Sequence, residues 1–281
     1  MPFAGHVRRL KRRFVPYVAN PTHSSFTLDD GTEMLNALRD AGASLDGDLL
    51  EVGSGWTPII PMLFHLAGAR TVTLTDLDRL YDEQSAPSAI DLLLSQEARV
   101  LSTFKIGREA FDARVAGFRP TYLCPWRPSQ SAANTFDIAI SRAVLEHIPP
   151  PEITRLFVEL RRVVRPGGFM CHSVDNTDHW QHGSHGLGLA HFLRYPTDSL
   201  RWRIASLNKH GFMNRLRHSD YIAAARQAGW TILAEQARVP EATLEQVTDM
   251  QRQELIAPEF QHYSLRDLAT TATLFVARRD G

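Results

Sequence analysis

The 281-residue chain contains few cysteines and no long apolar segment. Its two cysteines, Cys124 and Cys171, are too few for a disulfide framework and indicate a reducing compartment. No apolar run approaches the roughly 20 residues that cross a bilayer, and the N-terminus lacks the apolar core of a signal peptide. We therefore expect a cytoplasmic protein without a transmembrane segment.

The chain also lacks a net charge, because 31 basic residues balance 31 acidic ones. This balance argues against a nucleic-acid partner, which usually requires an excess of positive charge. One local excess occurs near the N-terminus, where residues 8–13 hold five basic side chains. It is either an arm for an anionic substrate or membrane surface, or a solvated leading helix or tail. The sequence does not indicate an oligomeric state.

A glycine-rich turn at residues 51–58 (Glu-Val-Gly-Ser-Gly-Trp-Thr-Pro) lacks the third glycine of a dinucleotide-binding fingerprint, which is replaced by Pro58. The turn follows an apolar run and precedes a predicted helix. Glycines let the backbone approach a ligand, and the free N–H groups of the helix then face it. Because Glu51 would repel a phosphate, a neutral or positively charged adenosine compound fits better than a dinucleotide.

The hydrophobic pattern alternates between strands and helices along most of the chain. Strands are predicted at residues 48–52, 70–75, 118–123, 136–141, 169–174, 230–238 and 271–278. Helices are predicted at residues 27–41, 57–67, 85–115 (in two pieces around Thr103), 152–164, 219–228 and 241–256. This order predicts a doubly wound, mostly parallel sheet whose ligands bind at the carboxyl ends of the strands.

The alternation stops at residues 175–217, which are rich in histidine, tryptophan, arginine, glycine and asparagine. We interpret this stretch as a substrate cap inserted into the fold. The predicted organisation is an N-terminal helical and basic segment (1–44), a cofactor-binding core (45–174), the inserted cap (175–217) and a C-terminal part of the core (218–281).

Four features occur in a characteristic order: the turn at 51–58, the strand-ending Asp76, residues 136–148 (FDIAISRAVLEHI) and residues 160–170 (LRRVVRPGGFM). Together they resemble the class I S-adenosylmethionine-dependent methyltransferases, over about residues 45–175 and again at 219–278. The resemblance implies a Rossmann-like seven-stranded α/β sheet, mostly parallel with an antiparallel last strand. It also implies S-adenosyl-L-methionine as the cofactor.

The resemblance assigns cofactor contacts to specific residues. These are Glu51, Gly53, Ser54, Gly55, Asp76, Leu77, Ser141 and Arg142. Asp76 is favoured over Asp78 for the ribose because it ends the strand directly, and a carboxylate can accept two hydrogen bonds from a cis-diol. Where the family often has an acid near the adenine, this chain has residues 124–126 (Cys-Pro-Trp), so that contact stays open.

Histidines are concentrated around residues 172–191 and suggest catalysis. The predicted general base is His179, oriented by Asp178 or Asp175, with His147 as a further candidate. One alternative is a metal site formed by His179, His182 and His185, although nearby glycines argue against a rigid helical face. Another alternative is that these histidines only pack against substrate or face solvent.

The remaining predicted substrate contacts come from the cap. They are Asp175, His182, Arg194, Tyr195 and Arg215. The arginines could bind a carboxylate or phosphate bidentately, or equally form ion pairs that fix the cap.

The predicted function is methyl transfer to an oxygen, or next to a nitrogen, of a small molecule or saccharide. Two alternatives stay open: another reaction of a cofactor-binding enzyme with a metal in its cap, or a catalytically inactive binding protein. A nicotinamide-dependent dehydrogenase is disfavoured by Pro58.

Overall fold

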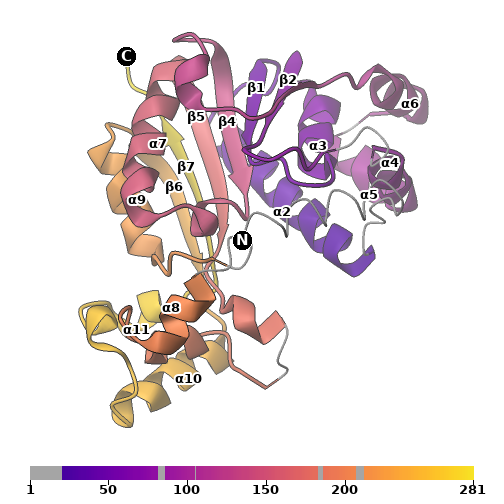
Figure 1. The fold of residues 1–281 in the computed structure, drawn as a ribbon. Coiled ribbons are helices and arrows are strands. Elements are labelled where there is room, and N and C mark those ends of the chain that lie inside the picture. Colours follow the sequence, from indigo (N-terminus) through magenta and orange to yellow (C-terminus); the bar gives the residue numbers. More distant parts are fainter. Residues whose placement is uncertain (1–20, 82–85, 105, 183–185, 207–211) are drawn as a thin grey trace. The chain divides into compact units, whose positions relative to one another are not determined.

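The computed structural model describes residues 21–81, 86–104, 106–182, 186–206 and 212–281. The basic residues 8–13 lie outside this range, so their predicted role stays a prediction. The described part of the chain is an α/β fold whose helices and strands alternate along most of its length (Figure 1).

A seven-stranded sheet in the order β3-β2-β1-β4-β5-β7-β6 organises the described residues. The strands are β1 (Asp48–Val52), β2 (Thr71–Thr75), β3 (Thr121–Leu123), β4 (Phe136–Arg142), β5 (Val164–Asp175), β6 (Thr231–Arg238) and β7 (Ala272–Arg278). Strand β1 runs parallel to β2 and β4, β2 runs parallel to β3, and β6 pairs antiparallel with β7. This topology confirms the predicted Rossmann-like sheet with an antiparallel last strand.

The chain divides into two compact units. The first unit contains the described residues up to Ser141, together with Arg162–Cys171 and Arg279–Gly281. The second unit contains Arg142–Arg161 and His172–Arg278. These two units are not the four consecutive segments predicted from the sequence, and they do not test that organisation, which stays a prediction.

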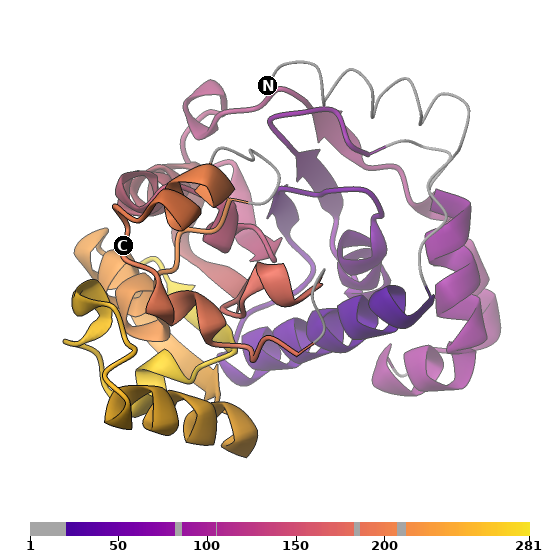
Figure 2. The same ribbon diagram turned by 60° about the horizontal axis from the view of Figure 1, so that its bottom comes forward.

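In the first unit, helices α2 (Pro21–Asp40) and α3 (Ile59–Ala67) pack against each other (Figures 1 and 2, where α2 is the long indigo helix). Their approach explains a glycine inside α2, because a Cβ at Gly31 would lie 2.7 Å from Cδ1 of Leu63. The described residues of this unit form three further helices: α4 (Ala86–Ser95), α5 (Glu97–Phe104) and α6 (Arg108–Gly117). The sequence predicted two helical pieces here with a break around Thr103, and the break nearest to it ends at Gly107, which precedes α6. The additional break lies at Gln96, between α4 and α5.

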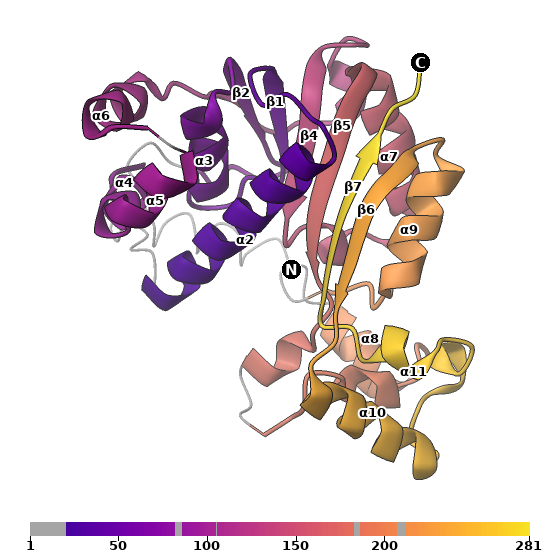
Figure 3. The same cartoon turned by 180° about the vertical axis from the view of Figure 1, so that it is seen from behind.

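In the second unit, α9 (His218–Gln227) packs against the antiparallel pair β6 and β7 (Figure 3). Helix α7 (Pro150–Val163) begins earlier than predicted. Its prolines Pro150 and Pro151 occupy the first turn, where the missing N–H groups would have no helical partner. The strand predicted at 169–174 begins earlier in the structure, so that residues 165–168 lie inside β5, with Gly167 at a φ of 79°.

The second unit also has short helical segments that the periodicity did not predict. These are the 3-10 turns η3 (Leu145–His147), η4 (His179–His182), η5 (His191–Arg194) and η6 (Pro258–Phe260), and the helices α8 (Leu200–Ser206) and α11 (Leu265–Leu268). The predicted helix at 241–256 corresponds to α10 (Glu241–Arg252).

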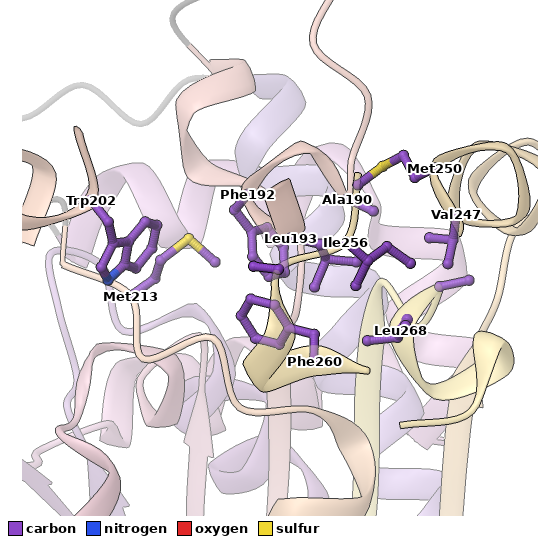
Figure 4. Close-up of a cluster of buried hydrophobic side chains, with 12 residues drawn as sticks. Ala190, Phe192, Leu193, Trp202, Met213, Val247, Met250, Ile256, Phe260 and Leu268 are labelled. Carbon is purple, nitrogen blue, oxygen red and sulfur yellow. The ribbon is translucent and has the colours of Figure 1, made fainter. Parts of the chain in front are cut away.

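A separate hydrophobic core lies among these segments (Figure 4). It joins residues from two stretches of chain, 190–213 and 247–269. Phe192 and Leu193 from the first stretch are fully buried with Val247 from the second. The segment predicted as the cap therefore shares its core with residues that the sequence placed in the C-terminal part of the sheet domain.

Candidate functional site

The turn after β1 is fastened to the end of β2 by main-chain hydrogen bonds. The N–H groups of Gly53 and Ser54 both donate to the carbonyl of Thr75, at 2.9 Å each. The Ser54 hydroxyl in turn accepts from the Thr75 N–H at 3.1 Å. Gly53 and Gly55 have φ angles of 72° and 63°, a region that favours glycine. A Cβ at Gly55 would meet nothing within 4 Å, so this turn borders open space.

Asp76 is oriented by two backbone donors at this turn. Its Oδ2 accepts from the Gly55 N–H at 3.1 Å, and its Oδ1 accepts from the Leu77 N–H at 2.9 Å. Burial raises the pKa of Asp76, while these backbone donors act in the opposite direction. Each carboxylate oxygen keeps acceptor capacity beyond these bonds, so the side chain can still accept from a diol.

Glu51 is buried at the end of β1, with 5% of its surface exposed. Burial raises the pKa of Glu51 to about 8, the charge of Asp76 adds to the rise, and a contact with Ser54 opposes it. Among the described residues, Oε2 of Glu51 has no hydrogen-bond partner. A buried carboxyl with an unused acceptor fits a ligand that carries positive charge and N–H donors.

The segment after β3 lies directly beside Asp76. The Asp76 N–H donates to the Leu123 carbonyl at 3.3 Å, and the Trp126 N–H donates to the Asp76 carbonyl at 2.9 Å. Trp126 is buried, and its indole N–H donates to the Ser131 hydroxyl at 3.0 Å. The segment expected near an adenine therefore adjoins the acid expected at the ribose.

Ser141 is buried at the end of β4, and Arg142 is the last residue of that strand. The η3 turn follows three residues later and is held by Asn214. The amide nitrogen of Asn214 donates to the carbonyls of Leu145 at 2.7 Å and Ile148 at 2.8 Å. Asn214 was not assigned a role from the sequence, because its partners are more than 60 residues away in the chain.

The backbone carbonyl of Phe212 fixes the ring of His147. The Nδ1 atom of His147 lies 2.7 Å from this carbonyl oxygen, which can only accept, so Nδ1 carries a proton. Burial lowers the pKa of His147, and nearby His179 lowers it further. The imidazole is therefore held neutral, with the lone pair on Nε2.

His179 lies between His147 and Asp175. The two imidazole centroids are 5.1 Å apart, and Nε2 of His179 is 3.6 Å from Oδ2 of Asp175. Burial alone would raise the pKa of Asp175, but contacts with His179 and Thr177 hold it at about 2. Of the two acids expected to orient His179, Asp175 faces the ring, whereas Asp178 accepts from the Trp180 N–H at 2.7 Å.

Glu146 belongs to the same group of side chains and was not singled out from the sequence. It has 2% of its surface exposed, and burial raises its pKa to about 8. The charge of Asp175 adds to this rise, and the charge of Arg142 opposes it. Glu146 could have been selected from the sequence, because it immediately precedes the candidate base His147.

Other predicted residues are distributed around the cap core. Arg215 is buried, and its guanidinium donates to the Tyr195 carbonyl and to the Thr197 hydroxyl. It also stacks on Trp202, with Cζ 3.7 Å from the ring centroid. Arg194 is exposed. The side chain of His182 and all of His185 lie outside what the structure describes, so their metal alternative stays a prediction.

A cavity of about 610 Å³ opens in the second unit beside Arg215. Its lining includes Trp202, Phe212 and Asn214. Phe212 and Asn214 are the residues that hold His147 and the η3 turn. One short segment thus both lines the cavity and positions the imidazole.

The parallel sheet, the glycine turn after β1 and the acid after β2 define a Rossmann-like protein that binds an adenosine cofactor. The sequence matches the methyltransferase domain family over residues 28–235, and the chain belongs to this family. This confirms the predicted superfamily, and S-adenosylmethionine is the cofactor.

Similar solved structures include an S-adenosylmethionine-dependent methyltransferase from Mesorhizobium loti, at 18% identity and a TM-score of 0.48, covering 90% of this chain and 100% of that one. Phosphoethanolamine N-methyltransferase 2 from Haemonchus contortus is 15% identical, with a TM-score of 0.48, covering 89% of this chain and 52% of that one. No curated protein matches the sequence. None of the helices in the described ranges has the length and apolar character needed to span a membrane.

Proposed function

We propose that this protein methylates a hydroxyl oxygen, or secondarily an amine nitrogen, of a small molecule or saccharide. The family supports methyl transfer as the reaction class. The proposed activation of the methyl acceptor rests on one observation: neutral His147 lies beside His179, in the turn that follows β4. S-adenosylmethionine supplies the methyl group, its sulfur keeping the electron pair of the broken bond while the acceptor atom forms the new one.

The cofactor residues are assigned by their chemistry. Asp76 is oriented to accept from the two ribose hydroxyls, and buried Glu51 suits the positively charged amino acid end. Gly53, Ser54 and Gly55 supply the backbone that passes close to the ligand. We further assign Leu77, Ser141 and Arg142 to cofactor contacts, as the family resemblance implies.

The acceptor is activated at the histidine pair. An acceptor hydroxyl loses its proton as the new bond forms, whereas an ammonium must lose one before its nitrogen can attack; a neutral imidazole is suited to take either proton near pH 7. Asp175 supports His179 in this role, because its carboxylate lies 3.6 Å from Nε2 and orients the ring. Asp178 is kept as a secondary candidate through its position next to His179.

The cavity of about 610 Å³ is the proposed acceptor pocket. Its volume lies within the range of small-molecule sites, roughly 300–1,000 Å³. Its aromatic and aliphatic lining suits the apolar face of a small molecule or sugar, and Arg215 offers one cationic group. Tyr195, Arg194 and His182 are proposed as further contacts from the same cap. Both cysteines are free, which supports a cytoplasmic location.

Calorimetric titration with S-adenosylhomocysteine tests the cofactor assignment. Asp76→Ala should weaken binding about 100-fold, because two hydrogen bonds to a charged acceptor are lost at about 1.5 kcal/mol or more each. Asp76→Asn keeps acceptor capacity and the shape of the turn, so it should lose less. Asp78→Ala serves as the matched control and should bind like the wild type.

Equal affinity of the wild type and Asp76→Ala would remove Asp76 from the ribose role. A wild-type protein that binds no S-adenosylhomocysteine would contradict the proposed function. Thermal unfolding of each variant, recorded by circular dichroism, separates loss of binding from loss of the fold.

A further inference from the structure

Three potential metal-binding side chains converge in the second unit: Glu146, His147 and His179. Each offers one donor atom, and these atoms all lie within 4.8 Å of one another. Two imidazole nitrogens and one carboxylate oxygen are a donor set that proteins use for divalent first-row metals. We call these three residues the Glu-His-His cluster.

We propose that the Glu-His-His cluster binds one divalent first-row transition-metal ion. The first argument is the state of Glu146. Its side chain is buried, and neither carboxylate oxygen makes a hydrogen bond within the described residues. The backbone N–H groups of Glu146 and Asp175 are near enough to influence it but do not make hydrogen bonds of good geometry. Buried carboxylates are otherwise paired or bound to metals, since leaving one unpaired is costly.

The second argument is how the two imidazoles are held. A histidine that binds a metal through one ring nitrogen generally directs the other to a carbonyl or carboxylate. Nδ1 of His147 is bonded to the Phe212 carbonyl, and Nε2 of His179 faces the Asp175 carboxylate at 3.6 Å. The opposite nitrogens, Nε2 of His147 and Nδ1 of His179, are then the ones assigned to the ion.

The third argument is the rigidity of the turn that carries two of the ligands. The side-chain amide of Asn214 donates to the carbonyls of Leu145 and Ile148, and its backbone N–H donates to the Glu146 carbonyl at 2.7 Å. With bonds of about 2.1 Å, two ligands in a tetrahedral site are about 3.4 Å apart. Donor atoms up to 4.8 Å apart therefore need to move closer by at most about 1.4 Å, within the reach of side-chain rotation, to bind an ion.

This inference rests on the proposed function and narrows it. Three protein ligands leave coordination positions open, as in catalytic rather than structural metal sites. A bound ion lowers the pKa of a hydroxyl that reaches it, so it would activate the acceptor in place of direct proton transfer to an imidazole. The substrate class becomes an oxygen acceptor whose hydroxyl, alone or with a neighbouring oxygen, binds a divalent ion.

The test uses the full chain without a histidine tag, stripped with a chelator and then dialysed. Calorimetric titration with Zn²⁺ should give one site per chain. A titration with Mn²⁺, monitored by the electron paramagnetic resonance signal of the free ion, should give the same stoichiometry. His179→Ala and Glu146→Gln should each weaken binding of the ion at least 10-fold. His262→Ala removes an exposed histidine outside the cluster and should leave the affinity unchanged.

The proposal is overturned if the wild type shows no saturable site for either ion, or if both variants bind it as the wild type does. Circular dichroism establishes that each variant is folded, and Glu146→Gln is nearly isosteric. Titration with S-adenosylhomocysteine is run on the same samples. If the wild type binds S-adenosylhomocysteine but has no metal site, only the metal proposal is overturned. If the wild type does not bind S-adenosylhomocysteine, the result counts against the proposed function.

Discussion

Among the described residues, each of the two units buries one glutamate, and the surroundings of the two carboxyls differ. Burial raises the pKa of Glu51 in the first unit and of Glu146 in the second to the same value, about 8. Near Glu51, the geometry comes from main-chain groups of the glycine turn fastened to Thr75. Near Glu146, it comes from imidazole side chains, each held by an acceptor of its own.

This difference separates two ways of building a site. A site made from backbone depends on a short local pattern and tolerates changes of many side chains. A site made from side chains depends on residues that only the fold brings together, so each residue contributes a larger share of the binding free energy. The predictions below test this contrast, from the largest expected effect to the smallest.

The largest effect is expected at Arg217, which supports the second unit. This side chain is 1% exposed, and its guanidinium donates to the carbonyls of Asn176, Thr270 and Asp267. Arg217→Met leaves these carbonyls without their donor, so the free energy of unfolding should fall by about 3–5 kcal/mol. Urea unfolding followed by circular dichroism measures this change.

The matched control is Arg252→Met, since the Arg252 side chain is 75% exposed and pairs only with nearby Asp249. It should change stability by less than about 0.5 kcal/mol. A loss below about 1 kcal/mol in Arg217→Met would show that side-chain hydrogen bonds are not what stabilises the second unit.

The next effect is a pH dependence caused by Glu51. The raised pKa means that between about pH 4.5 and pH 8 the folded state keeps a proton that the unfolded state has released. The free energy of unfolding therefore falls as pH rises through this window, by at most about 1.4 kcal/mol per pH unit for one proton, and levels off above it.

Glu51→Gln removes this contribution, so its stability should decline less steeply than that of the wild type over the same window. Denaturant titrations at several pH values give the two slopes. Glu241→Gln, a change at an exposed position, should follow the wild-type curve. Identical slopes for Glu51→Gln and the wild type would mean that Glu51 ionises normally in the folded protein.

The smallest effect is expected in the glycine turn. Gly55 has a φ of 63° and open space where a Cβ would lie, so Gly55→Ala introduces backbone strain without a steric clash. The expected loss of stability is about 1–2 kcal/mol. Affinity for S-adenosylhomocysteine should fall as well, because the new methyl group enters the space that the turn borders.

Gly107→Ala provides the comparison, because Gly107 also borders open space but has a φ of −80°. This variant should be as stable as the wild type or slightly more stable. Equal stability of the two alanine variants would show that the left-handed backbone of the turn carries no strain penalty.

The same contrast explains what the sequence could predict. The strands and the residues of the glycine turn follow from local patterns, since Glu51 and Asp76 each lie at the end of a predicted strand and Gly55 belongs to the turn between a strand and a helix. The choice between Asp175 and Asp178 did not follow, because it depends on a 3-10 turn rather than on helical spacing. Phe212 and Asn214 gave no signal either, since a backbone carbonyl and a distant amide have no sequence motif.

Asn214 has one further consequence for experiments on this protein. Its bonds to Leu145, Ile148 and Glu146 join uncharged amide and carbonyl groups. These attachments contain no titratable group, so the η3 turn should keep its position as the pH changes. A pH–rate curve would then record proton chemistry at the site itself and not a shift of the loop that carries His147.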